Sequence, residues 1–126
     1  MKVAIIDIIR VLDQTKRGLS GAKKLEGLFN EQQRELAPLI QQVKSKRDPK
    51  IEKTIEQKAK EHEQAREKMR VELREALLAQ ARKLMDEVAR DQGVDFVLAR
   101  PQAMMWAKPE LDITEAVIKA LDALPE

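Results

Sequence analysis

Apolar positions in the middle of the chain alternate in steps of three and four residues, which is the heptad pattern of helices that pack against each other. A first long helix is predicted from about Ser20 to Lys46, and a second from Pro49 to just before Gly93. The inward positions predicted for the first helix are Ala22, Leu25, Phe29, Gln32, Leu36, Leu39 and Val43. Those predicted for the second helix are Ile51, Ile55, Lys58, His62, Ala65 and Met69.

Local signals place the ends of these helices. Asp48 is an N-cap residue followed by Pro49 at the first helical position, so we expect the chain to turn and to start the second helix at once. Gly93 is placed to cap the end of that helix. Pro38 removes a hydrogen bond within the first helix and is predicted to bend it without ending it, because the apolar pattern continues beyond.

The second helix is predicted to be the longer of the two, and its apolar spacing changes beyond Met69. The later positions are Leu73, Leu77, Ala81, Leu84 and Val88. A run of four-residue steps relaxes a left-handed supercoil and marks a change of packing partner. We therefore expect this end of the helix to pack against something other than the first helix.

The N-terminal end of the chain predicts a strand and a short helix. The β-branched run at residues 3–6 suits a short buried strand, and Asp7 can cap the helix that follows. Lys16-Arg17-Gly18 places basic residues and a glycine where this short helix is predicted to stop.

The C-terminal end predicts two more strands and a last helix. Residues 94–98 read as a partly buried strand, and residues 103–107 as a second apolar strand whose side chains belong to the core. Asp112 and Glu115 have the spacing of a capping box at the start of the last helix.

Together these elements predict an α+β fold. Residues 1–20 and 91–126 are expected to form a small β-rich body, and residues 21–90 a long antiparallel coiled-coil hairpin arm with its tip at about residues 44–50. The body holds 56 residues, close to the lower limit for an independent core, and its short strands leave exposed edges. We therefore expect an obligate oligomer that pools strands from several chains. The residues expected in this oligomerisation body are Val3, Ile5, Phe96, Leu98, Met105, Trp106, Ile113, Val117 and Leu121.

Charge is distributed unevenly along the chain. The net charge of the whole chain is +2, whereas residues 44–90 carry +4 and residues 91–126 carry −4. A basic middle segment favours acidic partners and anionic lipid head groups, but its charge is too modest for nucleic-acid binding. The candidate contacts at the arm tip are Lys44, Lys46, Arg47 and Lys50.

Residue types that perform catalysis are scarce. The chain has one histidine, His62, which falls on the inward face of a helix, and it has no cysteine. Its four glycines form no phosphate-binding loop, and its carboxylates are spaced as solvated helix faces. We therefore predict no enzyme activity, no cofactor and no metal site.

No stretch approaches the roughly 20 apolar residues that cross a bilayer. Residues 3–9 are apolar but short, contain Asp7 and lack a small-residue cleavage site, so they are not a secretion signal. This predicts either a cytoplasmic protein or the mature form of a secreted one.

The two ends of the chain resemble the Skp/OmpH family of periplasmic chaperones. The opening residues 2–7, followed by Arg10-Val11-Leu12, are similar to the start of that family. Four later segments resemble the family's closing strands and terminal helix: residues 94–98, 103–107, 111–114 and 117–119. The Leu-Asp-Ile-Thr segment at 111–114 is the most specific of these matches.

This resemblance implies a homotrimer in which three chains share a β-barrel body and three arms enclose a cavity. It also implies a periplasmic holdase that keeps unfolded outer-membrane proteins soluble without ATP. Two other functions fit the same residues: a structural coiled-coil adaptor that binds a folded partner, and a prefoldin-like chaperone of the cytoplasm.

Overall fold

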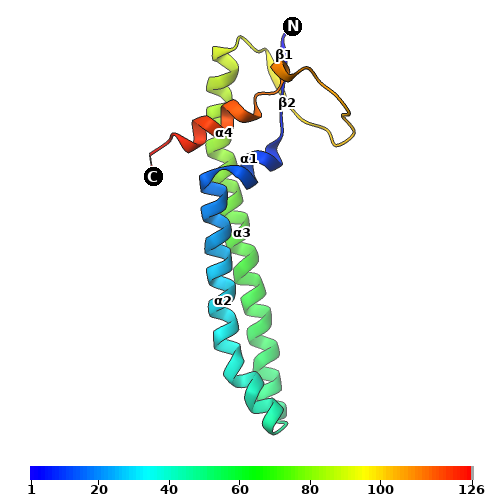
Figure 1. Cartoon of the computed structure of the whole chain (residues 1–126). Coiled ribbons are helices and arrows are strands. Elements are labelled where there is room, and N and C mark those ends of the chain that lie inside the picture. The colour runs from blue at the N-terminus through cyan, green and yellow to red at the C-terminus, as the bar shows by residue number, and fades with distance from the viewer. Residues whose placement is uncertain (126) are drawn as a thin grey trace. The chain divides into compact units, whose positions relative to one another are not determined.

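The computed structural model describes residues 1–125, and its fold is α+β, as predicted (Figure 1). The long helices α2 and α3 form a hairpin, and the remaining elements include one small sheet. In chain order the elements are β1 (Val3–Ile6), α1 (Ile8–Gln14), α2 (Lys16–Ser45), α3 (Pro49–Asp91), β2 (Phe96–Ala99), the 3-10 helix η1 (Pro109–Leu111) and α4 (Thr114–Asp122).

The chain divides into two compact units. The end unit comprises Met1–Ser20 and Arg74–Glu126, and the hairpin unit comprises Gly21–Leu73. The end unit therefore includes residues 74–90 of α3, which the sequence analysis assigned to the arm. Among the described residues, no helix is both long enough and apolar enough to span a bilayer.

The sheet of the end unit consists of two strands, β1 and β2. β1 pairs with β2 in parallel, with Val3 opposite Phe96, and Asp112 forms an isolated bridge to Ile5 on the strand's other side. The N–H of Ile113 donates to the carbonyl of Ile5 at 2.9 Å. β1 is thus hydrogen-bonded along both edges, whereas β2 pairs with no other strand among the described residues.

The core of the end unit joins this sheet to α3 and α4. The buried residues that form one cluster are Ala4, Ile6, Val11, Leu77, Ala81, Leu84, Ile113, Val117, Ile118 and Leu121. Burying a side chain of this size contributes about 1.5–3 kcal/mol. The cluster takes three residues from the four-residue steps of α3 and none from α2. This confirms that the later part of α3 packs against something other than the first long helix.

The boundary between α1 and α2 differs from the prediction. The first long helix begins at Lys16, so the predicted helix end at Gly18 and the predicted start near Ser20 were wrong. Thr15 separates the two helices: its hydroxyl donates to the carbonyl of Val11 at 2.8 Å and accepts from the N–H of Gly18 at 3.1 Å. Gly18 is instead required for close packing, because a Cβ there would lie 1.7 Å from the carbonyl oxygen of Leu12.

The start of α4 also differs from the predicted capping box. The carboxylate of Asp112 does accept from the N–H of Thr114 at 2.9 Å, but the N-cap position is Ile113. Glu115 does not complete a box, since its carboxylate pairs with Arg10 of α1. The Thr114 hydroxyl accepts from the N–H of Asp7 at 2.8 Å, which connects the starts of α1 and α4.

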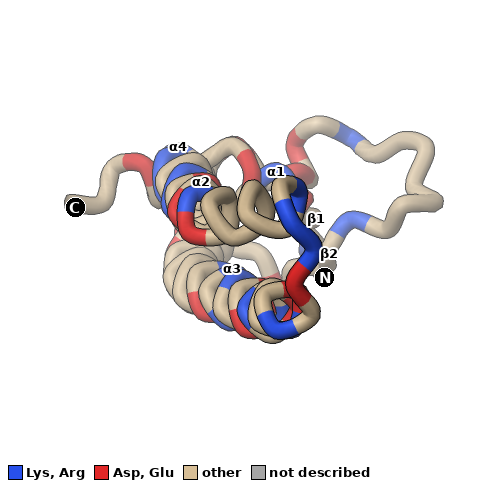
Figure 2. The backbone as a smooth tube through the Cα atoms, turned by 90° about the horizontal axis from the view of Figure 1, so that it is seen from below, with Lys and Arg blue, Asp and Glu red and all other residues tan. Residues whose placement is uncertain are grey.

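The predicted strand at residues 103–107 is absent. Residues 100–108 form a loop that leaves the sheet and returns to η1, and its middle carries no charge (Figures 1 and 2). Met105 and Trp106 are exposed, so the prediction that they lie in the core was also wrong for a single chain. A strand needs a neighbour to pair its backbone, and this segment has none among the described residues.

The helices α2 and α3 run antiparallel, and the predicted signals at the turn between them and at the far end of α3 are confirmed. The carboxylate of Asp48 accepts from the N–H of Lys50 at 2.9 Å at the start of α3. α2 continues through Pro38 without interruption. At the far end of α3, Gly93 has φ 65°, and the N–H of Val94 donates to the carbonyl of Ala89 at 2.9 Å, as in a Schellman motif.

The buried face of the hairpin follows the predicted heptads only in part. Ala22, Phe29 and Ala65 are exposed, and Gly21, Leu28 and Arg66 lie more buried in their place. Both helices take two successive four-residue steps, at 28–32–36 in α2 and at 58–62–66 in α3. An α-helix has 3.6 residues per turn, so the positions of a strict seven-residue repeat shift gradually around the helix axis. The extra four-residue steps bring the buried positions back to the face that meets the other helix.

We predict that Gly18→Ala destabilises the end unit by about 1–3 kcal/mol or more, because the added methyl group overlaps a backbone oxygen. Gly27→Ala is the matched control, since a Cβ there meets nothing within 4 Å and the helix gains about 1 kcal/mol from alanine. Urea unfolding of both variants measures the difference. Equal midpoints for the two variants would contradict the assigned packing of α1 on α2.

Candidate functional site

The tip, residues 44–50, joins α2 to α3 and is the first candidate site. The side chains of Lys44, Lys46, Arg47 and Lys50 are exposed. The Arg47 Nε donates to the carboxylate of Glu52 at 3.0 Å, and this is the one ion pair of the tip among the described residues. The predicted tip residues are thus brought together on one short turn and face solvent.

The tip carries the excess positive charge of the hairpin unit. Residues 21–73 contain 13 basic and 10 acidic residues, and the tip contains four basic residues and one acidic residue. Outside the tip, the hairpin unit therefore has nine of each sign. Figure 2 shows that blue and red segments alternate along the helices. An anionic partner is attracted to the turn more than to the neutral flanks.

A cluster of polar side chains lies between the helices at the level of the four-residue steps. We call it the Gln32 layer: Gln32, Glu35, Lys58, His62 and Arg66. Gln32 is only 5% exposed, and both ends of its amide have partners on α3. Its Nε2 donates to the backbone carbonyl of His62 at 3.0 Å, and its Oε1 accepts from Arg66 Nη1 at 2.7 Å.

The outer part of this layer centres on Glu35. Lys58 Nζ donates to its carboxylate at 2.7 Å, and His62 Nε2 lies 3.1 Å from it. An ionised carboxylate only accepts, so this contact assigns the proton of a neutral His62 ring to Nε2. His62 Nδ1 is buried and has no hydrogen-bond partner in the part of the chain that the structure describes. The hydrogen bond and charge of Lys58, with a smaller contribution from His62, lower the pKa of Glu35 from its usual 4.5.

Arg66 connects the layer to the one aromatic residue of the hairpin unit. Its guanidinium carbon lies 5.4 Å from the centre of the Phe29 ring, which is within cation–π range. Glu35 and Arg66 were not identified from the sequence as members of a site. The polar residues at the inward positions 32, 58 and 62 were the available signal.

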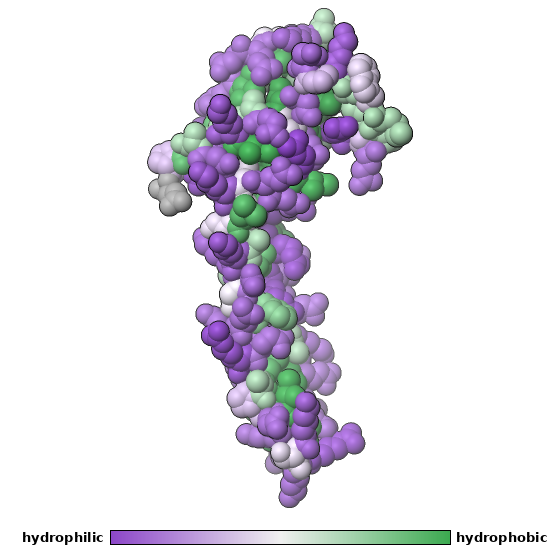
Figure 3. All heavy atoms as spheres, viewed as in Figure 1, coloured by the Kyte–Doolittle hydropathy of each residue, from purple (hydrophilic) through white to green (hydrophobic). Residues whose placement is uncertain are grey.

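The end unit has an exposed apolar surface, which we call the β2–loop surface: Phe96, Leu98, Met105 and Trp106. Their exposed fractions are 40%, 50%, 94% and 74%, so the predicted partial burial of residues 94–98 fails for Phe96 and Leu98. In Figure 3, pale green atoms mark the loop at the edge of the end unit. Surfaces of this kind on a soluble chain commonly mark interaction sites.

The other residues predicted for the oligomerisation body belong to the core of the end unit. Ile5, Ile113, Val117 and Leu121 are buried within the single chain, and Val3 is partly buried. These residues stabilise the fold directly. The exposed members of the predicted set are therefore those of the β2–loop surface.

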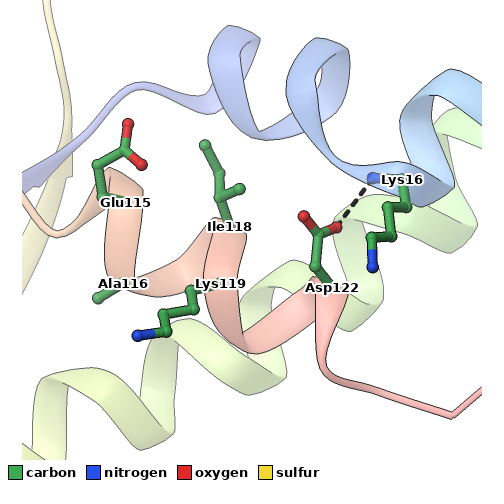
Figure 4. A pocket seen from close by; sticks show the side chains of 6 residues that line it. All are labelled: Lys16, Glu115, Ala116, Ile118, Lys119 and Asp122. Carbon is green, nitrogen blue, oxygen red and sulfur yellow. Dashed lines mark hydrogen bonds between the residues drawn. The ribbon is translucent and has the colours of Figure 1, made fainter.

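An open depression on the end unit has little capacity to hold a ligand. Its two carboxylates already have partners: Asp122 accepts from the N–H of Lys16 at 2.8 Å, and Glu115 pairs with Arg10. Figure 4 shows its lining, which consists of Lys16, Glu115, Ala116, Ile118, Lys119 and Asp122. Within residues 1–125, no three histidine or carboxylate side chains are grouped to bind a metal ion.

The comparisons with known proteins identify the family. A family model described as "Outer membrane protein (OmpH-like)" matches residues 2–121, which is nearly the whole chain. The chain belongs to the OmpH-like family. None of the curated proteins matches it. The match confirms the resemblance seen in the terminal segments of the sequence.

Family membership gives the general class of function. OmpH-like proteins are periplasmic chaperones that bind unfolded outer-membrane proteins, and the family is not known as an enzyme family. The surfaces described above are consistent with a binding protein: a basic tip, a long charged hairpin and an exposed apolar surface.

We predict that Glu35→Gln weakens the hairpin at neutral pH and has little effect in acid. A carboxyl whose pKa is lowered by folding stabilises the fold above its unfolded pKa, and this contribution is lost as the pH falls below 4.5 through the lowered value. The urea midpoints of the two proteins should therefore converge at low pH. Because Glu35 is half exposed, the difference at neutral pH should be small and should shrink with salt.

Glu31→Gln is the matched control, since Glu31 lies one turn earlier on α2 and makes no ion pair among the described residues. Its midpoint should follow the parent at every pH. If the difference between the urea midpoints of Glu35→Gln and the parent stayed the same from neutral to acid pH, the assigned ion pair would be contradicted.

Proposed function

We propose that the protein is a homotrimeric holdase that keeps unfolded outer-membrane proteins soluble between its helical arms without ATP. The family supports the kind of partner. The observation that carries the trimeric mechanism is the β2–loop surface, because a single chain leaves two apolar strand residues and a tryptophan in water. Pairing with other chains removes this surface from solvent and provides a neighbour for the free edge of β2.

In the proposed assembly, the end units of three chains form the shared β-rich body that was expected from the sequence. Three chains would pool β1, β2 and the segment at residues 103–107 into a shared barrel, and the loop segment would gain the strand partner that it lacks in one chain. A two-stranded sheet is marginally stable in water, which favours such pooling. The arms, residues 21–90, would then enclose the client.

The binding surface proposed for clients and for anionic membranes is the tip, with Lys44, Lys46, Arg47 and Lys50. It contains no aromatic or large apolar side chain, so its contacts would be electrostatic and exchange readily. Contacts of this kind hold a partner without fixing its conformation, which suits a holdase. They also weaken with salt.

We predict that the protein in solution has three times the 14.4 kDa mass of the chain and that Trp106→Ala lowers this mass. Truncating a tryptophan that stays exposed changes the stability by less than about 0.5 kcal/mol. Truncating one that is buried in an assembly lowers the stability by about 3–5 kcal/mol. Light scattering and thermal melting measure both effects. Val71→Ala, an exposed apolar residue of the hairpin unit, is the control and should change neither quantity.

We predict that replacing the four basic residues of the tip with glutamine leaves the mass unchanged and weakens suppression of aggregation of an unfolded outer-membrane protein at low salt. A control variant loses the same charge from the rest of the hairpin unit, at Lys23, Lys24, Lys60 and Lys68. It should retain more activity, because these lysines lie in the neutral flanks. No suppression by the parent protein would contradict the holdase, and equal losses in the two variants would contradict the tip as its contact.

A further inference from the structure

Two helix ends in the end unit carry charges of the sign that disfavours a helix at that position. α2 begins with Lys16 and Arg17 and has no acidic residue in its first turn. α4 ends at the acidic residue Asp122, although Lys119 in the same turn has the favourable sign. A helix has a partial positive charge at its N-terminus and a partial negative charge at its C-terminus. The two cations therefore weaken the start of α2, and the carboxylate weakens the end of α4.

The structure brings these two helix ends together. The carboxylate of Asp122 accepts from the backbone N–H of Lys16 at 2.8 Å (Figure 4). Arg17 Nη2 donates to the backbone carbonyl of Pro125, just after α4, at 2.9 Å. The negative charge of Asp122 thus lies at the positive end of α2, where it is favourable.

The contact also supplies a hydrogen-bond acceptor to the first turn of α2. The first N–H groups of an α-helix have no acceptor within the helix itself. Thr15 serves two N–H groups: its hydroxyl accepts from Gly18 at 3.1 Å, and its carbonyl accepts from Leu19 at 3.0 Å. Asp122 serves the first group of the helix, the N–H of Lys16.

Apolar contacts hold α4 in place independently of this hydrogen bond. Val117, Ile118 and Leu121 belong to the buried cluster of the end unit, and Leu124 packs against that cluster. Because these contacts fix the backbone of α4, the carboxylate of Asp122 is held close to the start of α2. Such preorganisation lowers the entropy cost of forming the contact.

α2 is the helix that passes from one unit to the other. Its residues 16–20 belong to the end unit, and it continues to Ser45 in the hairpin unit. The first turn is the least favourable part of a helix to form, and later residues add to a turn that already exists. A cap in the end unit therefore favours a helix that supplies one side of the hairpin.

We propose that Asp122 acts, together with Thr15, as a cap of α2 that is supplied by the last helix of the chain. Each of the two helix ends is weak alone, and each offsets the unfavourable charge of the other. The start of the long helix is thus tied to the docking of α4 in the core of the end unit. This cap is a property of the chain without a client, so it stands or fails independently of the holdase activity.

Amide hydrogen exchange of the full-length Asp122→Ala variant tests the cap. The amides of residues 19–22 close the first turn of α2 and should exchange about fivefold faster than in the parent, the factor that corresponds to a typical helix cap. The amides of residues 118–122 in α4 should not exchange faster, because alanine favours the helix and removes an unfavourable charge from its end. A general loss of packing would instead speed exchange in both segments.

Two further variants separate the charge of Asp122 from its hydrogen bond and from its removal of an acidic group. Asp122→Asn keeps an oxygen acceptor but loses the charge, so exchange at residues 19–22 should be about twofold faster than in the parent. Asp13→Ala is the matched control, since Asp13 is an exposed acidic residue of α1 and makes no ion pair among the described residues. This control should leave the exchange of α2 unchanged.

A compensating substitution tests the mechanism directly. In the Asp122→Ala background, Lys16→Glu supplies a negative charge within the first turn of α2 itself. Exchange at residues 19–22 should return to within about twofold of the parent rate. Unchanged exchange of α2 in Asp122→Ala, equal acceleration of α2 and α4, or no recovery in the double variant would overturn the proposal.

Discussion

The structure of the end unit depends on the burial of β1. Ala4, Ile5 and Ile6 are almost fully buried, and the strand is hydrogen-bonded to β2 along one edge and to residues 112–113 along the other. This N-terminal strand therefore fixes two segments from the C-terminal end of the chain, and core side chains of α3 and α4 belong to the same buried cluster. The same arrangement leaves β2 as the outer strand, and the apolar surface that we propose for assembly lies on β2 and on the loop after it.

Positive charge and apolar surface are separated between the two units. The excess positive charge of the hairpin unit lies in its tip, whereas the end unit exposes the apolar side chains of the β2–loop surface. A chaperone that assembles through one surface and attracts clients through another needs such a separation, because a single mixed surface would allow clients to compete with assembly. Membership of the OmpH-like family supports unfolded outer-membrane proteins as the kind of partner, and their contact with the charged tip is our proposal.

The sequence predicted the elements whose signals are local. Asp7, Asp48 and Gly93 act at helix ends through contacts within a few residues, and all three positions were identified correctly. Gly18 was misassigned because its role is a close approach to the backbone of another helix, which no local pattern reveals. The segment at residues 103–107 has the composition of a strand, but one chain offers it no partner.

The candidate site was predictable to a similar degree. The tip residues form a continuous run in the sequence, so their grouping followed directly. The Gln32 layer draws on two helices, and its members depend on four-residue steps that a strict heptad assignment overlooks. Phe29 illustrates the consequence, since the heptad placed it on the buried face and the structure leaves it 43% exposed beside Arg66.

The pairing of Val3 with Phe96 has a consequence for the order of folding. These two residues are 93 positions apart in the sequence, so β1 stays unpaired while the hairpin, whose contacts are closer in sequence, folds first. We therefore expect the end unit to form only after nearly the whole chain has been made, so that incomplete chains cannot assemble.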